Sequence, residues 1–549
     1  MNKIPQSPFK LSATLSGLGL WNVYFIAKFI LASLGYLLLQ PAYNALLLVI
    51  LLLPPLHRAS WEKLRTALFV VAAFPLAYSE SWLPGIESVI ANAKGIAGFS
   101  MNYILQLAWD FINVQMLVWG VLLVLLYQLL KHFVRVSVLT VGYFLFCVIQ
   151  PYLTTVEVDG GVTPVMATKV VAKAQTGDTQ SVMPKDASIV DNETIQAWYT
   201  AFLEYEKERK ATLPNGLSEK DTPFDIVLLN ICSLSNDDLE ASDLDAHKVF
   251  EQFHIRFDHF NAATSYSGPA TLRLLNGACG QPSHGDLYGA RRPDCEIMNR
   301  LDQLGFRQYL FMDHSGDYDN YLPTLRKEAG LTAPHENKRP YPVRYIAFND
   351  EPIFDSLSVL RHWQRTTAQN KTKRSVSLIN LIALHDGNRL PRQSRWQAFK
   401  PRAKILLDDL NRFMRELDRT GRKVMLIVVP EHGAAVRGDK IQAPRLRDIP
   451  SLRITDVPVL VKFFGLKDLP KEQYHVTGDS SYLALSSLIG KTVATNFFSQ
   501  RAGAVSIEEL VRDLPETNVV SENGQSVVLR YKGKDYIRMN NDQWRPYAH

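Results

Sequence analysis

The sequence predicts an α-helical membrane domain followed by an α/β domain built on a parallel sheet. Almost all the long apolar runs of the 549-residue chain lie before residue 156. After residue 194, short β-rich runs alternate with helical patterns, which is typical of a parallel sheet covered on both faces. A chain of this length is also too long for one core, so at least two domains are expected. We therefore expect a membrane domain at residues 1–155, a linker at 156–193 and an α/β domain at 194–549.

The expected membrane domain contains five apolar runs. Residues 21–39, 114–130 and 136–153 approach the roughly 20 residues that a helix needs to cross a bilayer. Residues 43–56 and 67–78 form two shorter runs. A cleaved signal peptide would account for one run but not for five. The alternative to five crossings is a buried helical bundle in a soluble protein.

Basic residues flank these runs on alternate sides, at Lys3, Lys10, His57, Arg58, Lys63, Arg65, Lys131 and Arg135. Because cytoplasmic loops carry the excess of Lys and Arg, the N-terminus and these loops are expected in the cytoplasm. Five crossings then place everything after residue 153 outside, which in a bacterium is the periplasm. The formal charge of +6 is not gathered into a basic stripe, so no nucleic-acid partner is expected.

Six apolar segments are the expected strands of the α/β domain: DIVLLNI at 225, YLFMD at 309, VRYIAFN at 343, SLINLIALH at 377, KVMLIVV at 423 and VPVLVKFF at 457. The tail from Val519 onward contains hairpin-like pieces. Ligands of open α/β sheets gather at the carboxyl ends of the strands. Cys232 ends the first segment, His385 ends the fourth, and Glu431 with His432 follows the fifth.

These strand-end residues suggest a metal site, because thiolate, imidazole and carboxylate all suit Zn²⁺. No C-x-x-C or H-E-x-x-H signature accompanies them, and a histidine at a strand end is also a common structural residue. Cys279 and Cys295 flank a polar loop and should pair in an oxidising compartment. An unpaired Cys232 in an exported domain then needs a reason, which metal ligation would supply.

The stretch FDHFNAATSYSGPATLRLL, residues 257–275, carries the candidate nucleophile. The residue before a proline is pushed out of the α region, so a helix should begin at Pro269 with Gly268 as its cap. Of the neighbouring hydroxyls, only that of Ser267 directly precedes this start. It would face free backbone N–H groups and the positive end of a helix dipole, which suits a phosphate. The alternative is an ordinary capped surface helix.

These features together resemble the bacterial phosphoethanolamine transferases of the alkaline-phosphatase-like superfamily. The segments LLNICSLSNDDL, ATSYSGPATLRLL, NLIALHDGNRLP and VVPEHGAAVRGDKIQAPRLRDIPSLRITDVPVLVKFFG resemble the cellulose-modifying branch, the BcsG family. The resemblance runs through nearly the whole chain. It implies an alkaline-phosphatase/sulfatase-like periplasmic catalytic domain in which Cys232, Ser267, Glu431 and His432 hold Zn²⁺.

The resemblance also implies an activity: transfer of phosphoethanolamine from phosphatidylethanolamine to glucose hydroxyls of cellulose through a covalent intermediate on Ser267. His385 and Arg447 would be placed by the substrate, and Tyr266 lies beside the nucleophile within the matching motif. A multi-pass protein of the inner membrane is implied, with subunits of the cellulose synthase complex as partners. Lipid A-modifying relatives differ, because they use threonine as the nucleophile and an acidic residue where Cys232 stands.

Two other functions stay open at this point. One is a phosphatase or sulfatase of the same fold. Formylglycine sulfatases require an arginine four residues after the reactive residue, where this chain has Thr271. The other is a non-catalytic membrane scaffold for the cellulose machinery.

Overall fold

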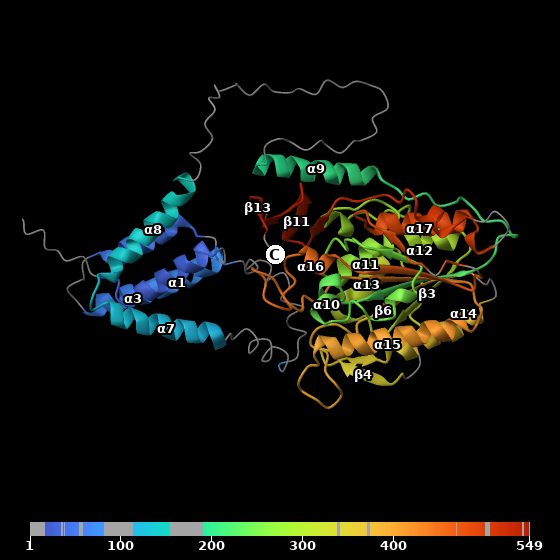
Figure 1. Cartoon of the computed structure of the whole chain (residues 1–549), viewed down its shortest axis with the longest axis horizontal. Coiled ribbons are helices and arrows are strands. Elements are labelled where there is room, and N and C mark those ends of the chain that lie inside the picture. Colours follow the sequence, from blue (N-terminus) through green and yellow to red (C-terminus); the bar gives the residue numbers. More distant parts are fainter. Residues whose placement is uncertain are drawn as a thin grey trace, which may run out of the picture. The chain divides into compact units, whose positions relative to one another are not determined.

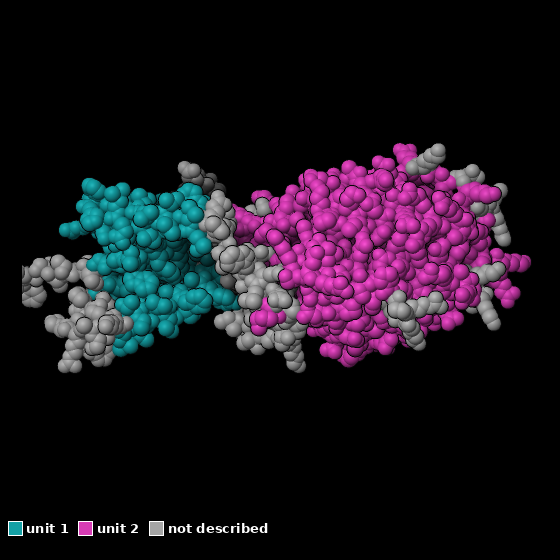
Figure 2. Space-filling view, turned by 90° about the horizontal axis from the view of Figure 1, so that it is seen from below, with its two compact units in different colours: residues 1–87, 107–178 teal, residues 88–106, 179–549 magenta. Residues whose placement is uncertain are grey.

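The computed structural model describes residues 17–34, 37, 39–53, 59–81, 101, 114–153, 190–336, 341–370, 374–467, 469–470, 472–499, 505–540 and 543–547. The chain divides into two compact units, residues 1–87 with 107–178 and residues 88–106 with 179–549 (Figure 2). The predicted linker at 156–193 lies almost entirely outside the described residues. The predicted domain boundaries therefore stay a prediction.

Helices lie at all five predicted apolar runs: α1 (Trp21–Ser33), α2 (Pro41–Leu52), α3 (Ala59–Glu80), α7 (Val114–Leu130) and α8 (Val136–Leu153). Phe25, Phe29, Leu48, Phe69 and Phe144 share a buried cluster that packs α1, α2, α3 and α8 together. Within the part of the chain that the structure describes, no helix combines the length and the apolar character needed to cross a membrane. The five crossings therefore stay a prediction.

The second unit is built on a seven-stranded sheet with the order β3-β6-β1-β7-β8-β2-β9. Its strands are β1 (Asp225–Ile231), β2 (Ile255–Phe257), β3 (Arg307–Met312), β6 (Ser375–Leu381), β7 (Val424–Pro430), β8 (Val459–Phe464) and β9 (Tyr474–Val476). The central strand β1 pairs in parallel with β6 on one side and with β7 on the other. The α/β class and the strands around β1 thus agree with the sequence prediction.

Helices cover both faces of this sheet (Figure 1). They are α11 (Ser267–Leu275), α12 (Ile297–Gln303), α13 (Tyr321–Glu328) and α17 (Tyr482–Ala494) on one face, and α14 (Ser356–Ala368) and α15 (Phe399–Asp418) on the other. Because side chains alternate along a strand, Ile226 and Leu228 enter the first core while Val227 and Leu229 enter the second. Three shorter helices of the same unit are α10 (Asn236–Ala241), α16 (Leu452–Thr455) and α18 (Ile507–Val511).

A four-stranded antiparallel sheet forms the C-terminal tail, with strands β10 (Val520–Glu522), β11 (Ser526–Tyr531), β12 (Lys534–Met539) and β13 (Arg545–Pro546). The predicted hairpin is therefore confirmed. Helix α9 (Asn192–Glu208) lies along this sheet (Figure 1), and Trp198 and Phe202 of the helix share a core with Leu529 and Trp544.

Two predicted strands differ from the expected parallel sheet. Strand β8 runs antiparallel to β7, because the connection between them contains only the one-turn helix α16 and no crossover helix. Strand β4 (Val343–Ile346) pairs instead with β5 (Pro352–Phe354) in a separate two-stranded sheet. Val343 is 43% exposed, which does not suit a strand covered on both faces.

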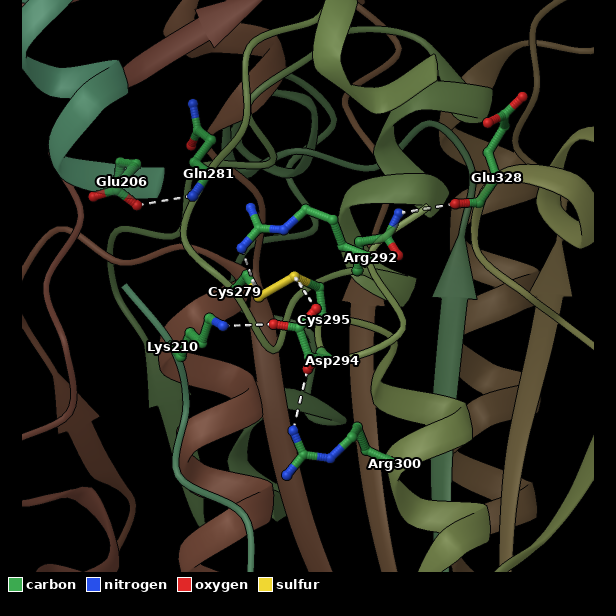
Figure 3. Close-up of a disulfide and its surroundings, with 10 residues drawn as sticks. Glu206, Lys210, Cys279, Gln281, Arg292, Asp294, Cys295, Arg300 and Glu328 are labelled. Atoms are coloured by element: carbon green, nitrogen blue, oxygen red, sulfur yellow. Dashed lines mark hydrogen bonds and ion pairs between the residues drawn. A yellow bond between two sulfur atoms is a disulfide. The ribbon is translucent and has the colours of Figure 1, made fainter. Parts of the chain in front are cut away.

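The predicted disulfide joins Cys279 to Cys295 in the loop between α11 and α12 (Figure 3). Polar contacts fix this loop to its surroundings. Lys210 Nζ lies 2.6 Å from a carboxylate oxygen of Asp294, and Arg300 donates to the Asp294 carbonyl at 3.2 Å. The other two cysteines of the chain, Cys147 and Cys232, are free.

Candidate metal centre and nucleophile

Three candidate metal ligands follow neighbouring central strands. Cys232 comes directly after β1, and Glu431 with His432 comes directly after β7. The parallel register opposes Ile231 to Pro430, so the residues that come next leave the sheet at the same edge. All three side chains are fully buried, and one ligand atom from each lies within 4.8 Å of the others. The structure thus brings together the three candidate ligands that were predicted from the strand ends.

Ser267 is the first residue of α11, so the predicted helix start at Pro269 was wrong. A residue before proline avoids the α conformation because its Cβ and N–H clash with the proline ring. Gly268 has no Cβ, so the clash is smaller and the helix can begin two residues earlier. Ser267 therefore lies in the first turn, where the backbone N–H groups have no acceptor within the helix.

The four candidate ligands have the spacing of a metal site. Ser267 Oγ lies 3.3 Å from Cys232 Sγ and 3.2 Å from His432 Nε2. The same Nε2 lies 3.9 Å from Cys232 Sγ and 4.0 Å from Glu431 Oε2. Ligands at zinc–donor distances of roughly 2.0–2.3 Å in a tetrahedral shell stand about 3.3–3.6 Å from one another. The separations of 3.2–4.0 Å between the donor atoms of this chain are close to those of such a shell.

The two oxygens of Glu431 have different surroundings. Oε1 accepts from Asn380 Nδ2 at 2.6 Å and lies 3.2 Å from the Thr271 hydroxyl and 3.4 Å from the Tyr321 hydroxyl. Oε2 is buried and has no hydrogen-bond partner among the described residues. A buried carboxylate oxygen without a partner costs free energy. A cation beside Oε2 would remove that cost, so the site fits a metal.

Burial sets the protonation of these groups in the metal-free protein. It raises the pKa of the Cys232 thiol to about 12, and the charge of Glu431 contributes to this rise. It also raises the pKa of Glu431 and, with the positive charge of Arg447, lowers the pKa of His432 well below the ordinary value. The His432 imidazole is therefore neutral, as a metal ligand requires. Its Nδ1 donates to the Gly433 carbonyl at 2.8 Å, which leaves a lone pair on Nε2.

Arg447 and Tyr266 lie at the edge of this centre. Arg447 Nη1 is 3.3 Å from Ser233 Oγ and 3.3 Å from His432 Nδ1. The Tyr266 hydroxyl donates to an Asp448 carboxylate oxygen at 2.8 Å. Burial and the charge of Asp448 raise the pKa of Tyr266, so this phenol stays protonated.

His385 does not end its strand, because β6 stops at Leu381 and His385 lies in the turn that follows. Its ring stacks on Phe348 with 4.8 Å between centroids, and its Nδ1 donates to the Asp386 carbonyl at 2.8 Å. Burial and the charge of Arg447 lower its pKa to about 3, so the imidazole is neutral. His385 is therefore held by the turn after β6, and its positive-charge neighbour Arg447 is the same residue that lies beside His432.

The residues that support Glu431 were not predicted from the sequence. Asn380 Nδ2 also donates to Asn230 Oδ1 at 2.8 Å, and Asn380 Oδ1 accepts from His314 Nε2 at 2.7 Å. Thr271 Oγ1 lies 3.0 Å from Asn230 Oδ1, in position to donate to it. The two asparagines interrupt otherwise largely apolar buried strands, and they face one another in the register of β1 and β6. A buried asparagine needs partners, so this interruption was the available signal.

Comparisons with known proteins agree with the resemblance noted from the sequence. Family models of the cellulose biosynthesis protein BcsG match residues 179–544 (C-terminal domain) and 21–149 (N-terminal domain). The cellulose biosynthesis proteins BcsG of Salmonella typhimurium and Escherichia coli K12 are each 38% identical to this chain, over 99% of its length and 98% of theirs.

Solved structures also align with this chain at low identity. A protein of the alkaline phosphatase superfamily from Vibrio parahaemolyticus aligns at 12% identity and a TM-score of 0.44, covering 62% of this chain and 84% of its own. The C-terminal periplasmic domain of EcEptC from Escherichia coli, in complex with Zn, aligns at 14% identity and a TM-score of 0.38, covering 57% and 93%. The family matches, in contrast, reach both units, and they confirm that this chain belongs to the BcsG family of cellulose biosynthesis proteins.

Proposed function

We propose that this protein transfers phosphoethanolamine from phosphatidylethanolamine to glucose hydroxyls of cellulose through a covalent intermediate on Ser267. Membership of a cellulose biosynthesis family supports the acceptor. One observation carries the chemistry: the Ser267 hydroxyl lies within 3.3 Å of both Cys232 Sγ and His432 Nε2, in the first turn of a helix. This position suits a hydroxyl nucleophile beside backbone donors for a phosphoryl group.

The proposed resident metal is Zn²⁺, held by Cys232, Ser267, Glu431 and His432. The unpartnered Oε2 of Glu431 and the spacing of the four donors support it. Zn²⁺ bound there would lower the pKa of the serine hydroxyl and polarise a phosphoryl oxygen.

The choice of Ser267 over its neighbours is supported by their hydrogen bonds. Ser265 is fully buried, and its Oγ donates to the Arg447 carbonyl while accepting from Asn523 Nδ2 at 2.7 Å. Tyr266 donates to Asp448. Ser267 is half-buried, and its hydroxyl lies among the candidate ligands, where a substrate could reach it.

In the proposed reaction, Ser267 Oγ attacks the phosphorus of the lipid, and the phosphorus–oxygen bond to diacylglycerol breaks. Diacylglycerol leaves with a proton, and phosphoethanolamine remains as a serine ester. A cellulose hydroxyl, the primary one in our proposal, then attacks the same phosphorus and releases Ser267. Arg447 stabilises charge on the transferred group. The neutral His385 has a free Nε2, which can accept the proton of the attacking hydroxyl.

The first unit is proposed to anchor the protein in the bacterial inner membrane, with the catalytic domain in the periplasm. Helices α7 and α8 expose large apolar side chains, among them Trp119 (64%), Leu125 (59%), Leu139 (59%) and Phe146 (54%). A surface of this kind marks a membrane or protein contact. The anchor would keep the site near its lipid donor and near cellulose leaving its synthase, whose subunits are the proposed partners of the helices.

A strain that carries Ser267→Ala tests this function. We expect it to make a normal amount of cellulose that lacks phosphoethanolamine, as measured by compositional analysis of the purified polymer. Cellulose decorated at the normal level would contradict the proposal. If the protein were a non-catalytic scaffold, cellulose from the Ser267→Ala strain would have the same composition as cellulose from the wild type. A hydrolase would release free phosphoethanolamine in vitro without labelling the glucan.

A further inference from the structure

We infer that Asn523, in the turn between β10 and β11, is a positioning residue that holds the loop before Ser267 against the loop that carries Arg447. The inference rests on the proposed function, because these loops present the proposed nucleophile and the proposed charge-stabilising arginine. Asn523 is 6% exposed and comes 258 residues after Ser265 in the chain. It connects two strands of the C-terminal sheet, which supplies no residue to the proposed reaction.

Both ends of the Asn523 amide are engaged. Nδ2 lies 2.7 Å from Ser265 Oγ, 2.9 Å from the Asp448 carbonyl and 3.2 Å from the Arg447 carbonyl. Oδ1 accepts from the Ser265 backbone N–H at 3.2 Å and from Thr264 Oγ1 at 2.9 Å. The two carbonyls can only accept and the Ser265 N–H can only donate, so the orientation of the amide is determined.

Bonds from the strand residues on either side of this turn reinforce the junction. Ser526 Oγ donates to the Asp448 carbonyl at 2.6 Å, and the Glu522 N–H donates to the Ala263 carbonyl at 2.9 Å. Ala263 has a φ of 60°, a left-handed conformation that an alanine holds only when its surroundings impose it. Neither residues 262–266 nor residues 446–449 lie in a strand. No backbone ladder therefore sets the separation of the two loops. Direct bonds from Ser265 Oγ to the Arg447 carbonyl and from the Tyr266 hydroxyl to Asp448 join them, and the Asn523 amide bridges the same junction from the side, with bonds to both loops.

The expected consequence is specific to the transfer step. Cys232, Glu431 and His432 follow strands β1 and β7, so their positions do not depend on this amide. Loss of the amide should shift Ser267 relative to Arg447, and a misplacement of about 1 Å can slow a reaction about 100-fold. Asn523→Ala is therefore expected to form the serine ester about 100-fold more slowly, with unchanged half-saturation by lipid. At saturating zinc its zinc content should be unchanged, because three of the four proposed ligands keep their positions.

The experiment is a single-turnover measurement on the full-length protein in detergent, with phosphatidylethanolamine as donor and ester formation followed by mass. Ser521→Ala is the matched control, because Ser521 lies in β10 two residues before Asn523, is 1% exposed, and bonds to Asn261 and Thr455 rather than to residues 264–266 or 446–448. It should lose stability and keep the wild-type rate. Thr264→Val removes one partner of the amide, the 2.9 Å bond from Thr264 Oγ1 to Asn523 Oδ1, and leaves the direct bond between Ser265 and the Arg447 carbonyl in place. A slowing of about 10-fold is expected, and this variant tests the inference if Asn523→Ala does not fold.

Amide hydrogen exchange separates this inference from the proposed function. Asn523→Ala should exchange faster at residues 264–266 and 446–448, whereas Ser521→Ala should not. Unchanged exchange there, a wild-type rate in Asn523→Ala, or an equal slowing in Ser521→Ala would each overturn the inference. If the wild-type protein forms no ester at all, the proposed function fails, while the exchange result still decides whether Asn523 holds the two loops together.

Discussion

Glu431→Gln replaces the unpartnered carboxylate oxygen of the centre with an amide nitrogen of nearly the same size. Oε1 keeps its contacts with Asn380, Thr271 and Tyr321, so the side chain is expected to stay in place. An amide nitrogen that carries two hydrogens has no lone pair to offer a metal. The variant therefore removes one proposed ligand while leaving its surroundings intact.

Two effects of opposite sign follow from this change. Zinc affinity should fall at least about 100-fold, because losing a residue that only hydrogen-bonds a metal ligand already weakens metal binding by about 10–100-fold. At saturating zinc this removes about 2.7 kcal/mol from the free energy of unfolding. Without metal, burial raises the pKa of Glu431, so its charge lowers stability as pH rises above the unfolded pKa. A neutral glutamine does not place a charge in this buried site. The metal-free variant should therefore be at least as stable as the metal-free wild type near neutral pH.

Zinc titration against a competing chelator, together with urea unfolding with and without zinc, measures both effects. Glu206→Gln is the control, because Glu206 is a buried carboxylate bonded to Arg209 and to the Gln281 N–H, away from the centre. It should lose stability and keep the wild-type zinc affinity. Wild-type zinc affinity in Glu431→Gln would refute the ligand assignment, as would an equal loss in the control.

Three further predictions concern other parts of the catalytic unit. Asn380→Ala removes the amide that donates to Glu431 Oε1 at 2.6 Å, and the same zinc titration should show zinc binding weakened about 10–100-fold. Unchanged zinc affinity would show that the hydrogen bond from Asn380 does not support the proposed ligand. Burial raises the pKa of Asp313 to about 7, so the free energy of unfolding should fall as pH rises from about 4 to about 7. In urea unfolding, Asp313→Asn should remove up to about 4 kcal/mol of that fall. An unaltered dependence of the unfolding free energy on pH would contradict this prediction. Replacing Cys279 and Cys295 together by serine should cost about 3 kcal/mol of unfolding free energy in the same assay and leave zinc content unchanged, because the pair closes a separate loop.

The strand ends of the candidate site could be predicted because continuous apolar runs show where buried strands stop. Cys232, Glu431 and His432 were placed at one edge of a sheet on that basis, and the structure brings them together. The reversed direction of β8 could not be read in the same way, because an apolar strand has the same pattern in both directions. The start of α11 was missed because the pre-proline rule was applied without allowing for the absent Cβ of Gly268.

The hydrogen bonds that support the site lay beyond sequence reasoning. Asn380 reaches Glu431 only because β6 and β7 both flank β1, and Thr271 reaches it only because α11 packs over the same strands. Asn523 meets Ser265 across 258 residues. Such pairs have no characteristic spacing, since each depends on how separate elements pack. Periodicity therefore indicates the elements of this domain, while the polar partners emerge only from the tertiary structure.

The most direct test of the proposed chemistry is peptide mapping by mass after incubating the full-length protein with phosphatidylethanolamine and no acceptor. We expect one phosphoethanolamine ester, on Ser267, which disappears when a soluble cello-oligosaccharide is added and reappears on the sugar. An ester on Ser265, or labelled sugar formed without any ester on the protein, would contradict a covalent transfer through Ser267.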